Sequence, residues 1–131
     1  SGFVDWFASG VASSLTGISW MMALGILCLI NMYVHYAFAS LSAHVGATYA
    51  AFLAVAVAAG APPMMAALAL GCETGIMGCL THYATGPAPI YFGAGYHSQP
   101  EWWKIGFICS ISSLICFLII GPIWWKALGL W

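Results

Sequence analysis

The chain has 131 residues, of which 63% are hydrophobic and only 4% are charged. A soluble domain carries about 25% charged residues, so this sequence has too little polar surface to face water on all sides. Its net charge of −1 excludes the clustered basic surface by which proteins bind nucleic acid. We therefore expect an all-α integral membrane protein, with the lipid bilayer as its first partner and no nucleic-acid partner.

The first segment, residues 3–16, alternates apolar and polar side chains. Asp5 lies between aromatic residues, and Trp6 follows it directly. This mixture predicts a short interfacial helix with Trp6 at the level of the lipid headgroups. The opening Ser1-Gly2-Phe3, which has no initiator Met, is expected of a fragment cut from a longer protein.

Residues 18–59 contain two apolar runs around a polar point. The first run, 18–38, is long enough to span, since a spanning helix needs about 20 apolar residues. A break is expected over 40–46, and the second run, 47–59, has only about 13–15 residues before the turn signal Gly60-Ala61-Pro62-Pro63. Two helices that meet at a polar apex, one of them short, predict a re-entrant hairpin over 18–59.

Residues 62–96 read as a helix that is broken in the membrane. A helix is expected over 64–80, with many small residues that allow close helix approach and with one acid, Glu73. Two prolines and a glycine within residues 86–89 cannot continue a helix, so a second break is expected over 81–89. A short apolar piece follows over 90–96.

The last segment, 101–125, is one unbroken apolar run. The pairs Trp102-Trp103 and Trp124-Trp125 lie at its two ends, where aromatic residues mark the membrane interfaces. We expect this run to be the final transmembrane helix of a single membrane unit over 1–131.

The two breaks are the candidate sites for chemistry. Irregular backbone at membrane depth survives only inside protein or beside a water-filled cavity. A helix that starts there directs N–H groups and a positive dipole end at an anion, and free carbonyls on the other side favour a cation. From spacing alone, ordinary extramembrane turns remain an equal alternative.

Other residues leave further alternatives open. His35 and His82 could ligate a haem between helices in a small structural subunit, or they could be hydrogen-bonded packing. Glu73 could relay protons, or it could lie near an interface. The five cysteines have no metal-site spacing, so no metal is expected. No catalytic set is present, and we do not expect an enzyme.

Several motifs together resemble the divalent anion/sodium symporter family. They are His35-Tyr36-Ala37-Phe38-Ala39-Ser40-Leu41-Ser42-Ala43-His44-Val45-Gly46, Leu80-Thr81-His82-Tyr83-Ala84-Thr85-Gly86, Tyr91-Phe92-Gly93-Ala94-Gly95-Tyr96 and Trp124-Trp125-Lys126-Ala127-Leu128-Gly129-Leu130-Trp131. The sequence is most similar to the branch with plastid 2-oxoglutarate/malate translocators and bacterial citrate and tartrate exchangers, and the resemblance covers essentially the whole chain.

The resemblance implies a fold and a site. In this family, two inverted repeats each carry a re-entrant hairpin with a Ser-Asn-Thr tip and a helix broken at a Thr-Pro-rich loop. The tip and the loop hold a substrate carboxylate and, in symporters, sodium. On this chain, the implied substrate-binding residues are Ser40, Leu41, Ser42, Thr85, Gly86 and Pro87. The implied ion or coupling residues are His44, Thr81, His82, Ala84 and Ala88.

Two positions depart from the family's tip. Leu41 stands where the family has Asn, so one carboxylate-binding side chain is missing, and Ser42 replaces Thr but keeps a hydroxyl. His44 follows directly, and we hypothesise that it stands in for a sodium ion, which favours obligate exchange. No cofactor is expected, apart from Na⁺ if the protein is a symporter.

The resemblance also implies the function. We expect half of an inverted-repeat elevator transporter that moves di- or tricarboxylates such as 2-oxoglutarate, malate, succinate or citrate by alternating access. The other half of the site would come from the first repeat, in a protein that forms a homodimer. The expected location is a bacterial inner membrane or a plastid inner envelope. A channel is a third option, which would pass current without an exchange stoichiometry.

Overall fold

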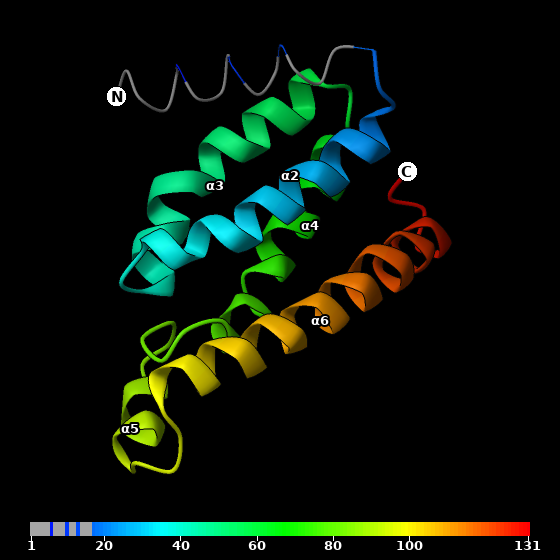
Figure 1. The fold of residues 1–131 in the computed structure, drawn as a ribbon. Coiled ribbons are helices and arrows are strands. Elements are labelled where there is room, and N and C mark those ends of the chain that lie inside the picture. Colours follow the sequence, from blue (N-terminus) through cyan, green and yellow to red (C-terminus); the bar gives the residue numbers. More distant parts are fainter. Residues whose placement is uncertain (1–5, 7–9, 11–12, 14–16) are drawn as a thin grey trace.

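The computed structural model describes Trp6, Gly10, Ser13 and residues 17–131. The interfacial helix expected over 3–16 therefore falls largely outside the described residues. Within the described part, three helical stretches are long and apolar enough to cross a membrane: Trp20–Ala37, Leu41–Ala58 and Gln99–Ala127. The all-helical membrane architecture expected from composition is present (Figure 1).

The first apolar run forms helix α2 (Trp20–Val34), which continues as a short 3-10 turn, η1 (His35–Ala37). The Ser19 side chain accepts a hydrogen bond from the Met22 N–H, which satisfies one of the amides that a helix start leaves unpaired. The tighter η1 turn ends at Phe38, whose extended backbone leads the chain out of the helix.

Helix α3 (Leu41–Ala58) begins earlier than expected. Ser40 has an extended backbone, and its hydroxyl oxygen accepts a hydrogen bond from the Ala43 N–H at 3.2 Å, so Ser40 is the N-cap. The break expected over 40–46 is therefore wrong in extent, because Ser42, His44 and Gly46 are helical. The helix has 18 residues and not 13–15, so its length no longer favours a re-entrant hairpin over two spans.

The end of α3 follows the turn signal in the sequence. Gly60 has φ +92°, a conformation that glycine adopts without a steric penalty. The Gly60 N–H donates to the Val57 carbonyl and the Ala61 N–H donates to the Ala56 carbonyl, which is the Schellman pattern of a helix C-terminus. Pro63 then occupies the first turn of the next helix, where its missing N–H costs nothing.

Helix α4 (Pro63–Glu73) ends well before the expected Leu80. Its chain continues through a turn and a 3-10 element, η2 (Met77–Cys79). The glycines at 71, 75 and 78 explain the early end, because each glycine weakens a helix by about 1 kcal/mol relative to alanine. Glu73 is thus the last residue of α4 and does not lie in a helix interior.

Helices α2, α3 and α4 pack together around one apolar core. In Figure 1, α2 and α3 run side by side in opposite directions, and α4 leads from the end of α3 down towards α6. Leu27, Phe52 and Leu70 are core members from the three helices. Small residues on α4, Ala66 and Ala69, are buried in the same core and allow the close helix approach expected from the sequence.

The remaining helices are α5 (Ala88–Gly93) and the long α6 (Gln99–Ala127). The Glu101 carboxylate accepts hydrogen bonds from the Ser98 N–H and O–H at 2.8 Å each, which fixes the start of α6. Gly106 brings α6 against η2: a Cβ there would collide with the Cys79 carbonyl oxygen and lie 2.9 Å from that of Leu80. This contact places α6 against the second break.

Candidate functional site

The two breaks of the chain meet in space. The Leu41 N–H, at the start of α3, donates to the Ala84 carbonyl at 3.1 Å. A second bond runs from the Tyr83 hydroxyl to the Tyr36 carbonyl at 3.0 Å. The end of the α2–α3 hairpin and the loop between η2 and α5 are therefore fastened to each other by two hydrogen bonds, and we call this region the junction.

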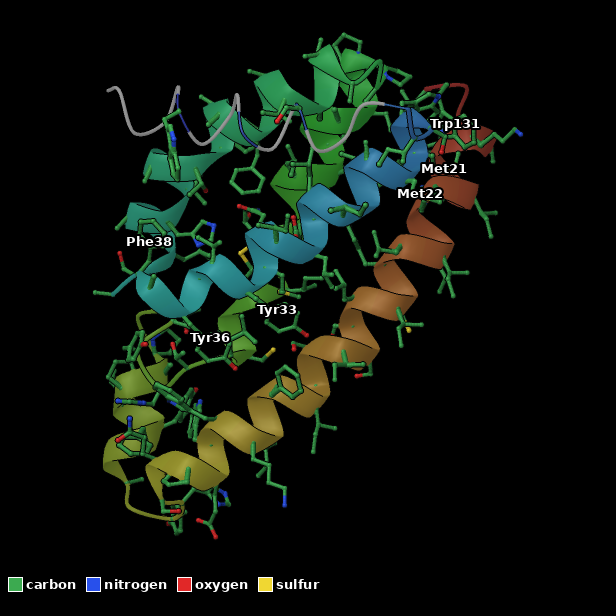
Figure 2. The ribbon with its side chains drawn as sticks, turned by 45° about the horizontal axis from the view of Figure 1, so that its top comes forward. Met21, Met22, Tyr33, Tyr36, Phe38 and Trp131 are labelled. Carbon is green, nitrogen blue, oxygen red and sulfur yellow. The ribbon has the colours of Figure 1, made fainter. Side chains whose placement is uncertain are left out.

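Aromatic side chains surround the junction. Figure 2 shows Tyr33 and Tyr36 projecting from α2 and η1 towards α6, whereas Phe38 lies at the turn into α3. The Tyr36 ring is 5.5 Å from the Trp103 ring, and the Phe38 ring is 4.9 Å from the His44 ring, measured between centroids. The Tyr33 hydroxyl is 3.2 Å from the Ser110 hydroxyl of α6.

The outer side of the junction carries the sequence-predicted tip. Ser42 is exposed and Leu41 is half-buried, in the first turn of α3. An open depression of about 470 Å³ is lined by Leu41, Ser42, Val45 and Gly46. Ser40 has a second role that the sequence did not assign, because its hydroxyl is used to cap α3.

The second break supplies the other predicted residues. Ala84 and Ala88 are buried, Thr85 is half-buried, and Gly86 and Pro87 are exposed. The Thr85 methyl group packs beside Gly78, where a Cβ would lie 2.7 Å from it. This close contact holds Thr85 against the turn that follows α4.

Two further side chains of this break, those of Thr81 and His82, lie apart from the exposed tip. Thr81 is fully buried, and its hydroxyl has no hydrogen-bond partner in the described part of the chain. The His82 Nδ1 atom accepts a hydrogen bond from the Trp103 indole N–H at 3.1 Å, and its ring packs 4.5 Å from that of Phe92. His82 is therefore part of an aromatic cluster that joins α5 to α6.

The environment of His35 differs from that of His82. The Nδ1 atom of His35 faces the Nδ1 atom of His44 at 3.2 Å, in the interior between η1 and α3. The haem pair considered above would need His35 and His82 to approach one iron from two sides. In the structure, the two rings have different partners: Nδ1 of His35 faces His44, and Nδ1 of His82 accepts from Trp103.

His44 points inward and not into the exposed depression. Its side chain is fully buried, and its Nε2 atom is 2.9 Å from the Asn31 Oδ1 atom. Because Nδ1 faces His35, both ring nitrogens are engaged within the protein. In this structure, His44 thus lies beneath the tip without reaching the surface that carries Ser42.

A buried polar network continues from His44 to α4. The Asn31 amide nitrogen donates to the Glu73 Oε2 atom at 3.2 Å, and the Thr48 hydroxyl lies 3.2 Å from Asn31 Oδ1 and 2.9 Å from the His44 carbonyl. Sequence analysis did not assign Asn31 or Thr48 to the site. One sequence signal could have located them. Asn31 lies four residues before His35, and Thr48 lies four residues after His44, so each pair shares one helix face.

Comparison of the sequence with known proteins identifies the family of the chain. The family model for the sodium:sulfate symporter transmembrane region matches residues 1–131. The chain belongs to this family. The match confirms the resemblance drawn from the motifs, and it makes the chain part of a membrane transporter family and not of an enzyme family or a haem-anchoring one.

Several curated relatives are similar over almost the whole chain. The chain is 48% identical to dicarboxylate transporter 1, chloroplastic, of Spinacia oleracea over 132 residues, which are 99% of the chain and 23% of that protein. It is 53% identical to the putative malate transporter YflS of Bacillus subtilis over 130 residues, 99% of the chain and 27% of that protein. It is 39% identical to the citrate/succinate antiporter of Escherichia coli K12, covering all of the chain and 26% of that protein. The chain thus spans about a quarter of the length of these relatives.

Proposed function

We propose that this chain forms one half of the substrate site of an elevator-type transporter for di- or tricarboxylates. The observation that carries the proposal is the Leu41–Ala84 backbone bond, which joins the hairpin tip to the second break so that both can move as one body. The relatives' names, which include dicarboxylate, malate and citrate/succinate carriers, support a carboxylate as the substrate.

The proposed contacts are made by the outer side of the junction. The exposed Ser42 hydroxyl and the first turn of α3 offer donors and a positive helix end, both of which favour a carboxylate. Thr85 offers a second hydroxyl, and the backbone of Gly86 and Pro87 lies beside it. Ser40 contributes by holding the N-terminus of α3. Leu41 contributes an apolar wall, while its N–H is bonded to the Ala84 carbonyl.

The remaining site residues have supporting roles in this proposal. Ala84 and Ala88 are buried and set the backbone of the second break. Thr81 and His82 shape the side of the loop that faces α6. In the proposed architecture, residues 18–59 form a re-entrant hairpin, residues 62–96 form the broken helix, and a first repeat supplies the opposing half-site in a homodimeric protein of a bacterial inner membrane or a plastid inner envelope.

We further propose that transport is an exchange in which His44 replaces a sodium ion. Because both of its ring nitrogens are engaged within the protein, His44 acts by holding the buried groups beneath the tip and not by touching the substrate. A side chain cannot be released with the substrate as a sodium ion can, so the carrier returns only when it is loaded with another anion.

The test is counterflow in proteoliposomes with the full-length transporter that carries this segment. Labelled malate, 2-oxoglutarate and citrate are offered outside against each unlabelled anion inside. Ser42→Ala and Thr85→Val are each expected to raise KM about tenfold, because a hydrogen bond to a charged group contributes about 1.5–3 kcal/mol. Ser112→Ala is the matched control, since its hydroxyl bonds the Cys109 carbonyl on α6, away from the junction.

Each part of the proposal has its own contrary result. Absence of carboxylate counterflow by the wild-type protein overturns the carrier function, and a current without exchange stoichiometry indicates a channel. Uptake that requires sodium overturns the role given to His44. Equal KM values for Ser42→Ala, Thr85→Val and Ser112→Ala remove the junction from the substrate site.

A further inference from the structure

The buried network beneath the tip has two open ends. It links Glu73 to Asn31, Asn31 to His44 and His44 to His35 through three hydrogen bonds of 2.9–3.2 Å. Glu73, His44 and His35 are fully buried. Among the residues that the structure describes, the Oε1 atom of Glu73 and the Nε2 atom of His35 have no hydrogen-bond partner, which is uncommon for buried polar atoms.

The bonds of Asn31 fix the hydrogen positions along the network. The Asn31 amide nitrogen is used by Glu73, so the atom that faces His44 is the amide oxygen, which is an acceptor only. The Nε2 atom of His44 must therefore carry a hydrogen. Between the two facing Nδ1 atoms there is room for one hydrogen, because two N–H groups at 3.2 Å would repel each other.

These fixed hydrogens leave two places for one more proton. With Nε2 of His44 and Nδ1 of His35 protonated, both rings are neutral and every internal bond of the network is made. A further proton can bind the Glu73 carboxylate, where Oε1 is the oxygen without a partner, or the free Nε2 atom of His35. The network then has no net charge, whereas without this proton it carries the charge of the Glu73 carboxylate.

We propose that Glu73, Asn31, His44 and His35 form a binding site for a single proton beneath the carboxylate site. Burying a net charge away from water is costly, so the network is most stable with one proton bound. When that proton leaves, an uncompensated negative charge lies beneath the tip and repels an anion above it. The role in transport rests on the proposed function, but the proton site itself does not.

The groups that face the network limit what else can titrate there. Cys28 of α2 is buried and its thiol lies against the Glu73 carboxyl, Thr48 contacts Asn31 and the His44 carbonyl, and the Phe38 ring lies against His44. Of these, only Cys28 is titratable. If Glu73→Gln abolishes a pH response while Cys28 is still present, that response therefore comes from the network.

The first experiment needs no transport. Nitrogen-15 NMR of the histidine side chains of the full-length transporter in lipid nanodiscs reports which ring nitrogens carry hydrogen. Wild type is expected to show His44 protonated at Nε2 throughout the pH range, and Asn31→Leu is expected to lose this preference. A bare His44 Nε2 in the wild-type chain would overturn the proposal without any variant having to fold.

The second experiment follows carboxylate exchange by the full-length transporter as a function of pH. The wild-type KM is expected to rise about tenfold as the proton is lost. Glu73→Gln keeps an acceptor for Asn31 but has no charge, so its KM is expected to stay constant apart from any titration of the substrate. Tyr49→Phe is the matched control, because it removes one α3–α4 hydrogen bond outside the network, and it is expected to follow the wild type.

The two experiments separate the two proposals. If the transporter does not exchange carboxylates, the proposed function fails, and the NMR result still tests the hydrogen positions on which the proton site depends. If exchange occurs and Glu73→Gln keeps the pH profile of the wild type, the proton site is wrong and the proposed function stands.

Discussion

The two breaks of this chain are built in different ways, although both interrupt apolar helices. The first break is short: η1 ends at Ala37, α3 begins at Leu41, and Ser40 caps the new helix through its own side chain. The second break extends from the end of η2 at Cys79 to the start of α5 at Ala88. Its described backbone bonds are isolated turns, such as that from the Ala84 N–H to the Thr81 carbonyl.

The difference shows where each break obtains its order. The first break has a local source of order in the Ser40 cap, besides the two hydrogen bonds that join it to the second break. The second is held from outside, by the close approach of α6 at Gly106, by the Trp103–His82 bond and by the Tyr83–Tyr36 bond. We therefore expect substitutions in distant elements to disturb the second break far more than the first.

The largest effect is expected at Gly106. Gly106→Ala places a methyl group against the carbonyl oxygens of Cys79 and Leu80, and because backbone cannot move aside as a flexible side chain can, we expect a loss of about 3 kcal/mol of stability. Thermal unfolding of the purified chain in detergent measures this loss. Gly25→Ala is the control, since a Cβ there meets no atom within 4 Å, and equal midpoints for the two variants would contradict the packing role of α6.

An intermediate effect is expected at the first break. Ser40→Ala removes the N-cap of α3 and should destabilise the chain by about 1.5 kcal/mol, whereas Ser40→Gly should cost only a few tenths of a kcal/mol. Denaturant titration of the two variants gives the difference. Ser19→Ala removes the N-cap of α2 and tests whether other N-caps of this chain contribute equally. If Ser40→Ala is as stable as Ser40→Gly, capping by Ser40 does not stabilise the first break.

The smallest effect is expected for the bond between the breaks. Tyr83→Phe removes the hydroxyl that donates to the Tyr36 carbonyl, and a hydrogen bond at a half-buried position contributes about 0.5–1 kcal/mol. Hydrogen exchange of the backbone amides of residues 81–86 should increase in this variant, while that of α3 stays unchanged. Faster exchange in α3 as well would show that the first break depends on the second.

The sequence predicted some features of the site well and others poorly. It located both breaks, because Ser40 and the Gly86–Pro89 stretch act through local backbone preferences. The predicted extent of the breaks was wrong, because residues 41–46 belong to α3 and residues 74–80 lie outside α4. A cap and a few glycines shift a helix end by several residues without changing the apolar pattern. It placed His44 at the tip but gave no sign that the side chain turns inward.

The sequence by itself determined that this is an apolar, all-helical chain with two breaks, because composition, helix length and break chemistry are local properties. Its motifs carried the resemblance to a transporter family, which the family match confirms. Only the tertiary structure decided which break residues meet. The Leu41–Ala84 bond and the Asn31–Glu73 bond, the latter across 42 positions, depend on how α2, α3 and α4 pack, and no periodicity records that packing. Helix packing brings the two predicted breaks together into one junction. The junction has exposed hydroxyl groups on its outer side and a buried polar network beneath them.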